Sequence, residues 1–353
     1  MARRGWVRSI VLAVLAAAGT AAAQLGLGYG LGIVAWVAPD GTSAAVAAGA
    51  WSASLTWSTW VAATAVVVGA VVGDRAAGNV QSGRFVRIAW RVVMAMAATL
   101  GALVTVPLVA VPARAAQIVD NYAPHLLAGI YATAGVVLGL IVALFALTAR
   151  AIAANVFASA GWLWTLALIA VVDSVAAGRG LGYAQLAVWR FTDGGPTWRT
   201  FYIPGALLML GAALLIGGLS AFPAAGRGDG RVGIAISGAA GPLLVAIAYV
   251  LAAPSQGQAP FEQMSAFHTA PYMVLAGLAG SVLVAVVGGV PARPSPHSPT
   301  PVSRAPIVAH VTQDSTHGGY SSSSPLPAAS SSAITAQARV PAASRADPAD
   351  EHW

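Results

Sequence analysis

The dominant pattern along the chain is a series of long apolar runs separated by short polar segments. A helix that crosses the hydrocarbon core of a bilayer needs about 20 mostly apolar residues. Prolines and charged residues flank most of the runs, as is usual at helix ends. The pattern therefore predicts an all-α transmembrane protein of about eight helices. The runs lie near residues 9–30, 57–73, 92–111, 126–148, 157–178, 203–222, 232–253 and 269–290.

The first apolar run begins like a secretory signal peptide. Arg3, Arg4 and Arg8 precede it, and the small residues 20–23 would suit a cleavage site. Apolar sequence nevertheless continues through residues 25–37, which a signal peptide does not require. We therefore expect an uncleaved first transmembrane helix, with a cleaved signal as the alternative.

Composition supports a membrane environment. Hydrophobic residues make up 58% of the 353 residues and charged residues only 8%, whereas soluble domains carry about 25% charged residues. The absence of cysteine excludes disulfides, thiolate metal sites and cysteine nucleophiles. The net charge of +7 would suit nucleic-acid binding in a soluble protein. Here the arginines lie at helix ends, where anionic lipid attracts them, so we expect the lipid bilayer as partner and no nucleic acid.

The arginines are divided unequally between the two sides of the predicted helices. The side with more arginine is normally cytoplasmic. We therefore predict a plasma-membrane protein with cytoplasmic N- and C-termini. We expect the basic segment 74–91 to face lipid, with protein docking as the alternative. The predicted inner arginines are Arg3, Arg4, Arg8, Arg75, Arg84, Arg87, Arg91, Arg150, Arg227, Arg231 and Arg293, and the outer ones are Arg114, Arg179, Arg190 and Arg199.

An internal repeat divides the membrane region into two four-helix halves, residues 1–150 and 151–293. Rare residues recur in the same order in both halves, several of them at identical spacing. Since four helices are an even number, the halves would be parallel and related by a pseudo-two-fold axis along the membrane normal. Such repeats are common among transporters but are not specific to them. The matched residues include Trp36 and Trp189, Asp40 and Asp193, and Arg91 and Arg231.

The Trp–Asp pairs of this repeat are predicted to anchor the membrane interface. Trp36 precedes Asp40, and Trp189 precedes Asp193 at the same spacing. Tryptophan favours the membrane–water interface, and the Asp-Gly dipeptides favour turns. We accordingly expect residues 27–36 to lie at the interface, outside the first membrane-spanning helix.

Asp173 is the only carboxylate placed well inside a predicted transmembrane helix, about six residues or roughly 9 Å from its outer end. A charge at membrane depth is costly, so such residues usually face protein or water and are often functional. One interpretation is a site for an ion or a proton. The other is a structural pair with Arg179 or Arg190.

His125 and His268 begin transmembrane helices at corresponding positions of the two halves, on the predicted outer side. With Asp173 and Arg179 they are candidates for a polar vestibule, in which imidazole would exchange protons near neutral pH. The alternative is that both histidines are solvated helix-end residues. No His-x-x-x-His or Glu-x-x-His spacing occurs on one helix, so we expect no metal site and no cofactor.

Glycines and prolines inside the predicted helices indicate how the helices pack. Glycines at close spacing let helix backbones approach one another. Pro107 and Pro242 lie inside the third and seventh predicted helices, where the missing N–H predicts kinks. The glycines concerned are Gly69, Gly73, Gly135, Gly139, Gly277 and Gly280.

Residues 294–353 are rich in proline, serine and alanine and show no hydrophobic periodicity. Such a segment does not bury enough apolar surface to fold alone. We predict a disordered cytoplasmic tail, which is a candidate binding segment for a cytoplasmic partner.

The chain also resembles a family of uncharacterised actinobacterial multi-pass membrane proteins. The resemblance rests on Asn155, Gly161-Trp162-Leu163-Trp164 and Asp173, and on Pro204-Gly205-Ala206-Leu207-Leu208. It extends over most of residues 1–290, and the use of arginine as the only basic residue besides histidine agrees with it. The family has no assigned activity, so the resemblance implies a cell type and no mechanism.

Two functional hypotheses follow. The first is a structural or interaction protein of the plasma membrane. The second is a transporter of a small solute, an ion or a lipid, with a site between the halves near Asp173. An enzyme is not expected, because no nucleophile–base pair or phosphate-binding loop is present in the sequence. The sequence does not indicate an oligomeric state.

Overall fold

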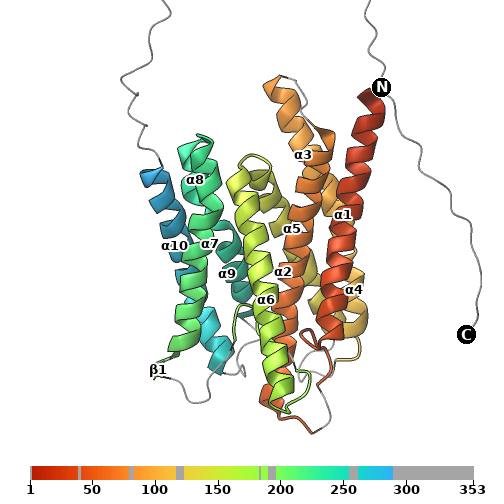
Figure 1. Ribbon diagram of the computed structural model, residues 1–353. Helices are drawn as coiled ribbons and strands as arrows, with labels where there is room; N and C mark the ends of the chain where they lie inside the picture. The colour runs from red at the N-terminus through yellow and green to blue at the C-terminus, as the bar shows by residue number, and fades with distance from the viewer. Residues whose placement is uncertain are drawn as a thin grey trace, which may run out of the picture. The chain divides into compact units, whose positions relative to one another are not determined.

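The computed structural model of the chain describes residues 2–38, 41–78, 83–116, 123–182, 184–189, 196–253 and 261–288 (Figure 1). These residues belong to one compact unit, which extends to residue 293. Asp40, Asp193 and the predicted tail 294–353 lie outside the described residues.

The described residues form antiparallel helices and one two-stranded hairpin (Figure 1). Seven helical spans are long and apolar enough to cross a membrane, and an eighth is completed if α8 and α9 form one span bent by 45°. The expectation of a mainly helical chain with multiple long apolar helices is thus confirmed. The elements are α1 (Ala2–Gly30), α2 (Ala44–Ala77), α3 (Arg84–Ala102), α4 (Thr105–Ala113), α5 (Pro124–Ala146), α6 (Arg150–Ala176), β1 (Thr197–Trp198), β2 (Phe201–Tyr202), α7 (Ile203–Gly226), α8 (Arg231–Ser237), α9 (Ala240–Ala252) and α10 (Phe261–Val287).

The central element is α2, which packs against α1, α3, α5, α6 and α9. It begins 13 residues earlier than the predicted run 57–73, since 57 − 44 = 13. The added segment is rich in alanine, and its residues 49–56 are buried within the protein. Buried hydroxyls of this segment bond within the helix: Ser54 donates to the Ala50 carbonyl at 2.8 Å and Thr56 to the Ser52 carbonyl at 2.9 Å. These hydroxyls therefore do not require water.

The helices predicted to kink are interrupted near both prolines, and the second interruption is bent by 45°. The break between α3 and α4 begins at Leu103, four residues before Pro107. The break between α8 and α9 begins at Gly238, four residues before Pro242. A proline lacks the N–H that would bond to the carbonyl four residues earlier, and its ring clashes with that carbonyl. Each helix therefore ends where its proline removes the bond.

The predicted glycine contacts are also confirmed. A Cβ atom at Gly73 of α2 would lie 2.6 Å from the Ala13 Cβ of α1, and one at Gly139 of α5 would lie 2.6 Å from the Ala63 carbonyl oxygen of α2. Both separations are shorter than a carbon atom tolerates. The absence of a side chain at these positions allows α1 and α5 to approach the two sides of α2.

The two predicted halves have similar internal contacts but are not equivalent. α1 packs on α2 and α2 on α5, as α6 packs on α7 and α7 on α10. However, α2 contacts α6 and α9 of the second half, whereas α7 makes no comparable contact with the first half among the described residues. Pro107 and Pro242 are 135 residues apart, but the matched Arg91 and Arg231 are 140 apart. The repeat therefore remains a prediction from the sequence.

The start of α1 and the end of α10 lie at the same end of the helices (Figure 1). We call this the basic end, because the helix connections also place there most of the arginines predicted to be cytoplasmic. Arg114, Arg179 and Arg199 lie in segments at the opposite end. The described basic-end arginines are Arg8, Arg75, Arg84, Arg87, Arg91, Arg150, Arg227 and Arg231.

Candidate functional site

Asp173 is partly exposed at the C-terminal end of α6. It lies in the last turn of α6, and its carboxylate accepts a hydrogen bond from the Arg179 guanidinium at 3.0 Å. The two side chains are 43% and 53% exposed, respectively. An acidic side chain near a helix C-terminus is electrostatically unfavourable, and the arginine offsets this. This is the pairing that the structural interpretation predicted.

We expect the substitution Asp173→Asn to change the free energy of unfolding by less than about 1 kcal/mol, because exposed ion pairs contribute little. Thermal unfolding of the purified protein would measure this. A loss of stability comparable to that of a core substitution would show that Asp173 has a role beyond its pair with Arg179.

The two histidines are not joined to this pair. His268 Nδ1 lies 2.7 Å from the Met264 carbonyl oxygen of its own helix, and its ring packs against Phe201 and Phe267. His125 lies at the start of α5. Among the described residues, no hydrogen bond or ion pair links either histidine to Asp173, so the structure does not bring the four candidates together.

Trp36, a predicted interface anchor, is covered by protein. Its indole packs edge-on against Trp51 at 5.1 Å and donates a hydrogen bond to the Tyr29 hydroxyl at 3.1 Å. The surrounding segment leaves the helix after Gly30, four residues later than expected, and packs inside the protein with Ile33 fully buried. Trp189 is half-buried in the matching segment of the second half, residues 184–189.

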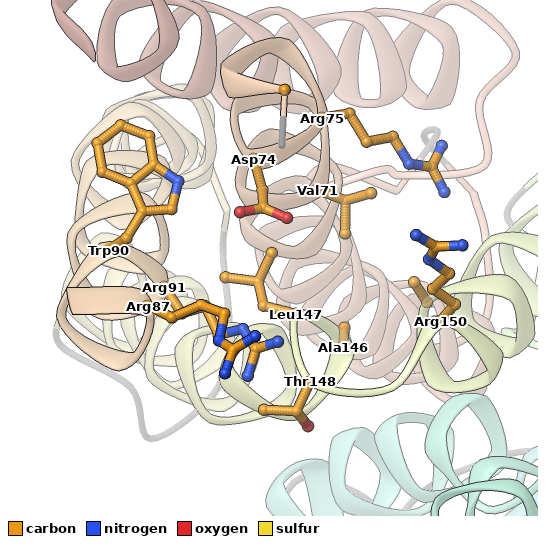
Figure 2. Close-up of a pocket in the computed structure, with 12 residues that line it drawn as sticks. Val71, Asp74, Arg75, Arg87, Trp90, Arg91, Ala146, Leu147, Thr148 and Arg150 are labelled. Carbon is orange, nitrogen blue, oxygen red and sulfur yellow. The ribbon is translucent and has the colours of Figure 1, made fainter. Parts of the chain in front are cut away.

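A polar cavity of about 610 Å³ opens at the basic end, between α2, α3, α5 and α6 (Figure 2). We call it the arginine cleft. Arg75 comes from the last turn of α2, Arg87 and Arg91 from α3, and Arg150 from the first residue of α6. The other lining residues are Val71, Asp74, Gly78, Trp90, Ala146, Leu147, Thr148 and Ala153.

Local structure explains the positions of these arginines. Arg87 and Arg91 are four residues apart, which places them on one face of α3. Arg75 lies at the C-terminal end of α2, where the helix dipole favours a cation. Figure 2 shows Arg75 and Arg150 pointing toward one another across one side of the cleft. Like charges in this arrangement repel unless an anion lies between them.

Asp74 is the only carboxylate among the residues that line the cleft. It interacts electrostatically with Arg91 and Arg75. The buried indole N–H of Trp90 is turned toward the Asp74 carboxylate (Figure 2), although the geometry falls short of a full hydrogen bond. Because four arginines and one carboxylate line the cleft, its net charge is positive.

The arginine cleft has the chemistry of an anion site. Guanidinium groups bind phosphate and carboxylate through paired hydrogen bonds, and several of them favour a group with more than one oxygen. The described residues contain no group of three His, Cys, Asp or Glu side chains suited to a metal ion.

The sequence pattern predicts that Arg75, Arg87 and Arg91 lie in a lipid-facing basic segment, and it does not link them with Arg150. The i, i+4 spacing of Arg87 and Arg91 was a usable local signal. Arg150 lies 59 residues after Arg91 in the sequence, since 150 − 91 = 59. Only the packing of α6 beside α2 and α5 places it at the same cavity.

Comparisons with known proteins identify no relative: no family model, no curated protein and no solved structure matches the chain. The resemblance to actinobacterial membrane proteins therefore remains a prediction.

Proposed function

We propose that this multi-pass membrane protein is an interaction protein that binds an anionic, phosphate-like group in the arginine cleft. The observation that carries the proposal is the convergence of four arginines from three helices on one cavity. We further propose that the basic end is cytoplasmic and that the membrane is the plasma membrane, because this orientation satisfies the positive-inside rule.

Helix-end arginines alone would be expected in any membrane protein. The cleft differs from that general pattern because its arginines line a shared cavity (Figure 2). Arg75 and Arg150 come from different helices and yet approach one another, an arrangement that an interposed anion would stabilise. Individual arginines at helix ends would attract anionic lipid equally well without lining a shared cavity.

The transporter hypothesis has less support. Its proposed residue, Asp173, is paired with Arg179 at a helix end. Polar groups within the helices include the half-buried Gln24, which bonds between helices: it accepts a hydrogen bond from the Trp164 indole at 2.9 Å and donates to the Thr64 hydroxyl at 3.3 Å. These contacts favour a structural role for the transmembrane helices. That the protein is not an enzyme remains a prediction.

Chemical modification of arginine tests the proposal on the full chain. Phenylglyoxal would be applied to the detergent-purified protein in chloride or in inorganic phosphate at equal ionic strength, and peptide mass spectrometry would follow each arginine. With phosphate at ten times its dissociation constant, we expect modification of Arg87, Arg91 and Arg150 to slow about tenfold, since only the unoccupied fraction reacts.

Arg114 and Arg199 are internal controls, because they are exposed and lie in segments at the opposite end. Their rates should be the same in chloride and phosphate. Equal rates at the cleft arginines in both salts, or equal protection of every arginine, would contradict a specific anion site.

A further inference from the structure

An apolar groove of about 300 Å³ lies next to the arginine cleft, between α1 and α3. α1 contributes Trp6 and Ile10, and the rings of Trp6 and Trp90 pack at 5.4 Å. Trp90 lines both the groove and the cleft. The two cavities are therefore neighbours that share one side chain. The remaining groove residues are Val86, Ala89 and Val93 of α3.

The helical register of α3 places its apolar residues and its arginines on different faces of the helix. Val86, Ala89 and Val93 follow the three- and four-residue spacing of one helix face, and Arg87 and Arg91 occupy the neighbouring face. The first turns of α3 thus present an apolar stripe to the groove and a cationic stripe to the cleft.

The groove follows α3 from the basic end toward the membrane interior. α3 begins at the basic end and leads into the bilayer, so Val86 lies nearer the surface than Val93. The seven residues between them correspond to roughly 10 Å of helix. The exposed Trp6 and Val86 leave the groove open to lipid at this depth. An elongated apolar chain would extend along it from the headgroup region toward the membrane interior.

We infer that the arginine cleft and this groove together bind one anionic phospholipid of the leaflet at the basic end. Its phosphate lies among the cleft arginines, and one acyl chain lies in the groove along Val86, Ala89 and Val93. The inference rests on the proposed anion-binding function and specifies its ligand. Charge complementarity supports an anionic headgroup, while the adjoining apolar groove favours a lipid over a free phosphate ion.

The natural absence of cysteine allows a site-specific test. A single cysteine at Val93 would be labelled with bimane, and the protein reconstituted into phosphatidylcholine vesicles that contain increasing fractions of phosphatidylglycerol with brominated acyl chains. Brominated chains quench bimane on contact. The matched control is bimane at Val286, an exposed apolar residue of α10 at the same end.

We expect half-maximal quenching at Val93 to require a lower fraction of brominated phosphatidylglycerol than at Val286. Each arginine that contacts the headgroup contributes about fivefold to this preference. The double substitution Arg87→Gln and Arg91→Gln should remove most of it. Brominated phosphatidylcholine should quench the two positions alike.

Equal quenching of Val93 and Val286 by the anionic lipid would overturn the lipid inference. If phosphate still protected the cleft arginines from phenylglyoxal, the anion site would stand without the lipid. If phosphate gave no protection either, both proposals would fail. Equal preference for brominated phosphatidylcholine and phosphatidylglycerol at Val93 would also overturn the inference, because the groove would then bind chains without regard to headgroup charge.

Discussion

Replacement of Gly277 by alanine is expected to destabilise the protein by about 3 kcal/mol, or to prevent it from folding. Gly277 of α10 lies against the break between α8 and α9. An added Cβ would overlap the Gly238 carbonyl oxygen and would approach the Pro242 Cγ to 3.2 Å. Neither atom belongs to a flexible side chain, so α10 would have to move away from these helices.

Thermal unfolding and size-exclusion chromatography in detergent would measure this effect. Gly211→Ala in α7 is the matched control, because a Cβ there has no atom within 4 Å. The control should be neutral or stabilising by up to about 1 kcal/mol, since alanine favours a helix over glycine. Equal stability of the two variants would contradict the close packing of α10 on the α8–α9 break.

The substitution Trp57→Ala is expected to cost about 3–5 kcal/mol. Trp57 is a fully buried residue of α2, and its ring lies 5.0 Å from that of Trp164 in α6. Its indole N–H donates a hydrogen bond of 2.8 Å to the Ala184 carbonyl. The side chain therefore joins the first predicted half to the second through both packing and a hydrogen bond.

Trp57→Phe separates these two contributions. It retains a six-membered ring but removes the donor and leaves the Ala184 carbonyl without it, so we expect a smaller loss of about 1–3 kcal/mol. Trp198→Ala is a control for aromatic loss at an exposed position of β1. Thermal unfolding of the three variants would provide the comparison. If Trp57→Ala were as mild as Trp198→Ala, Trp57 would not be a central contact between the halves.

Local sequence features predicted much of the fold. Apolar length identified the membrane helices, and the missing N–H of Pro107 and Pro242 identified two helix breaks. Gly73 and Gly139 indicated where backbones come close. Each of these features depends on a few neighbouring residues, which explains why a single sequence was sufficient.

Features that depend on distant contacts were not predicted. The early part of α2 was excluded because hydropathy measures compatibility with lipid, whereas protein surrounds this segment. The packing of Trp36 on Trp51 was likewise not predicted. In the same way, the arginine cleft requires Arg150 to meet residues of α2 and α3.

For Asp173, the sequence predicted a deeper position in the membrane than the structure supports. Counting residues from the expected helix end placed it well inside the membrane. In the structure α6 ends at Ala176, two residues before the expected end at 178, so Asp173 is only three residues from the helix terminus. Arg179 follows closely enough to pair with it.

The most direct test of the account is native mass spectrometry of the full chain, purified with equal amounts of phosphatidylglycerol and phosphatidylcholine. A variant with glutamine at Arg75, Arg87, Arg91 and Arg150 would be compared with wild type and with a control carrying glutamine at Arg114 and Arg199. Bound phosphatidylglycerol in wild type and control, with its loss from the cleft variant, is the predicted result. The same retained lipid in all three proteins would contradict an anion site in the arginine cleft.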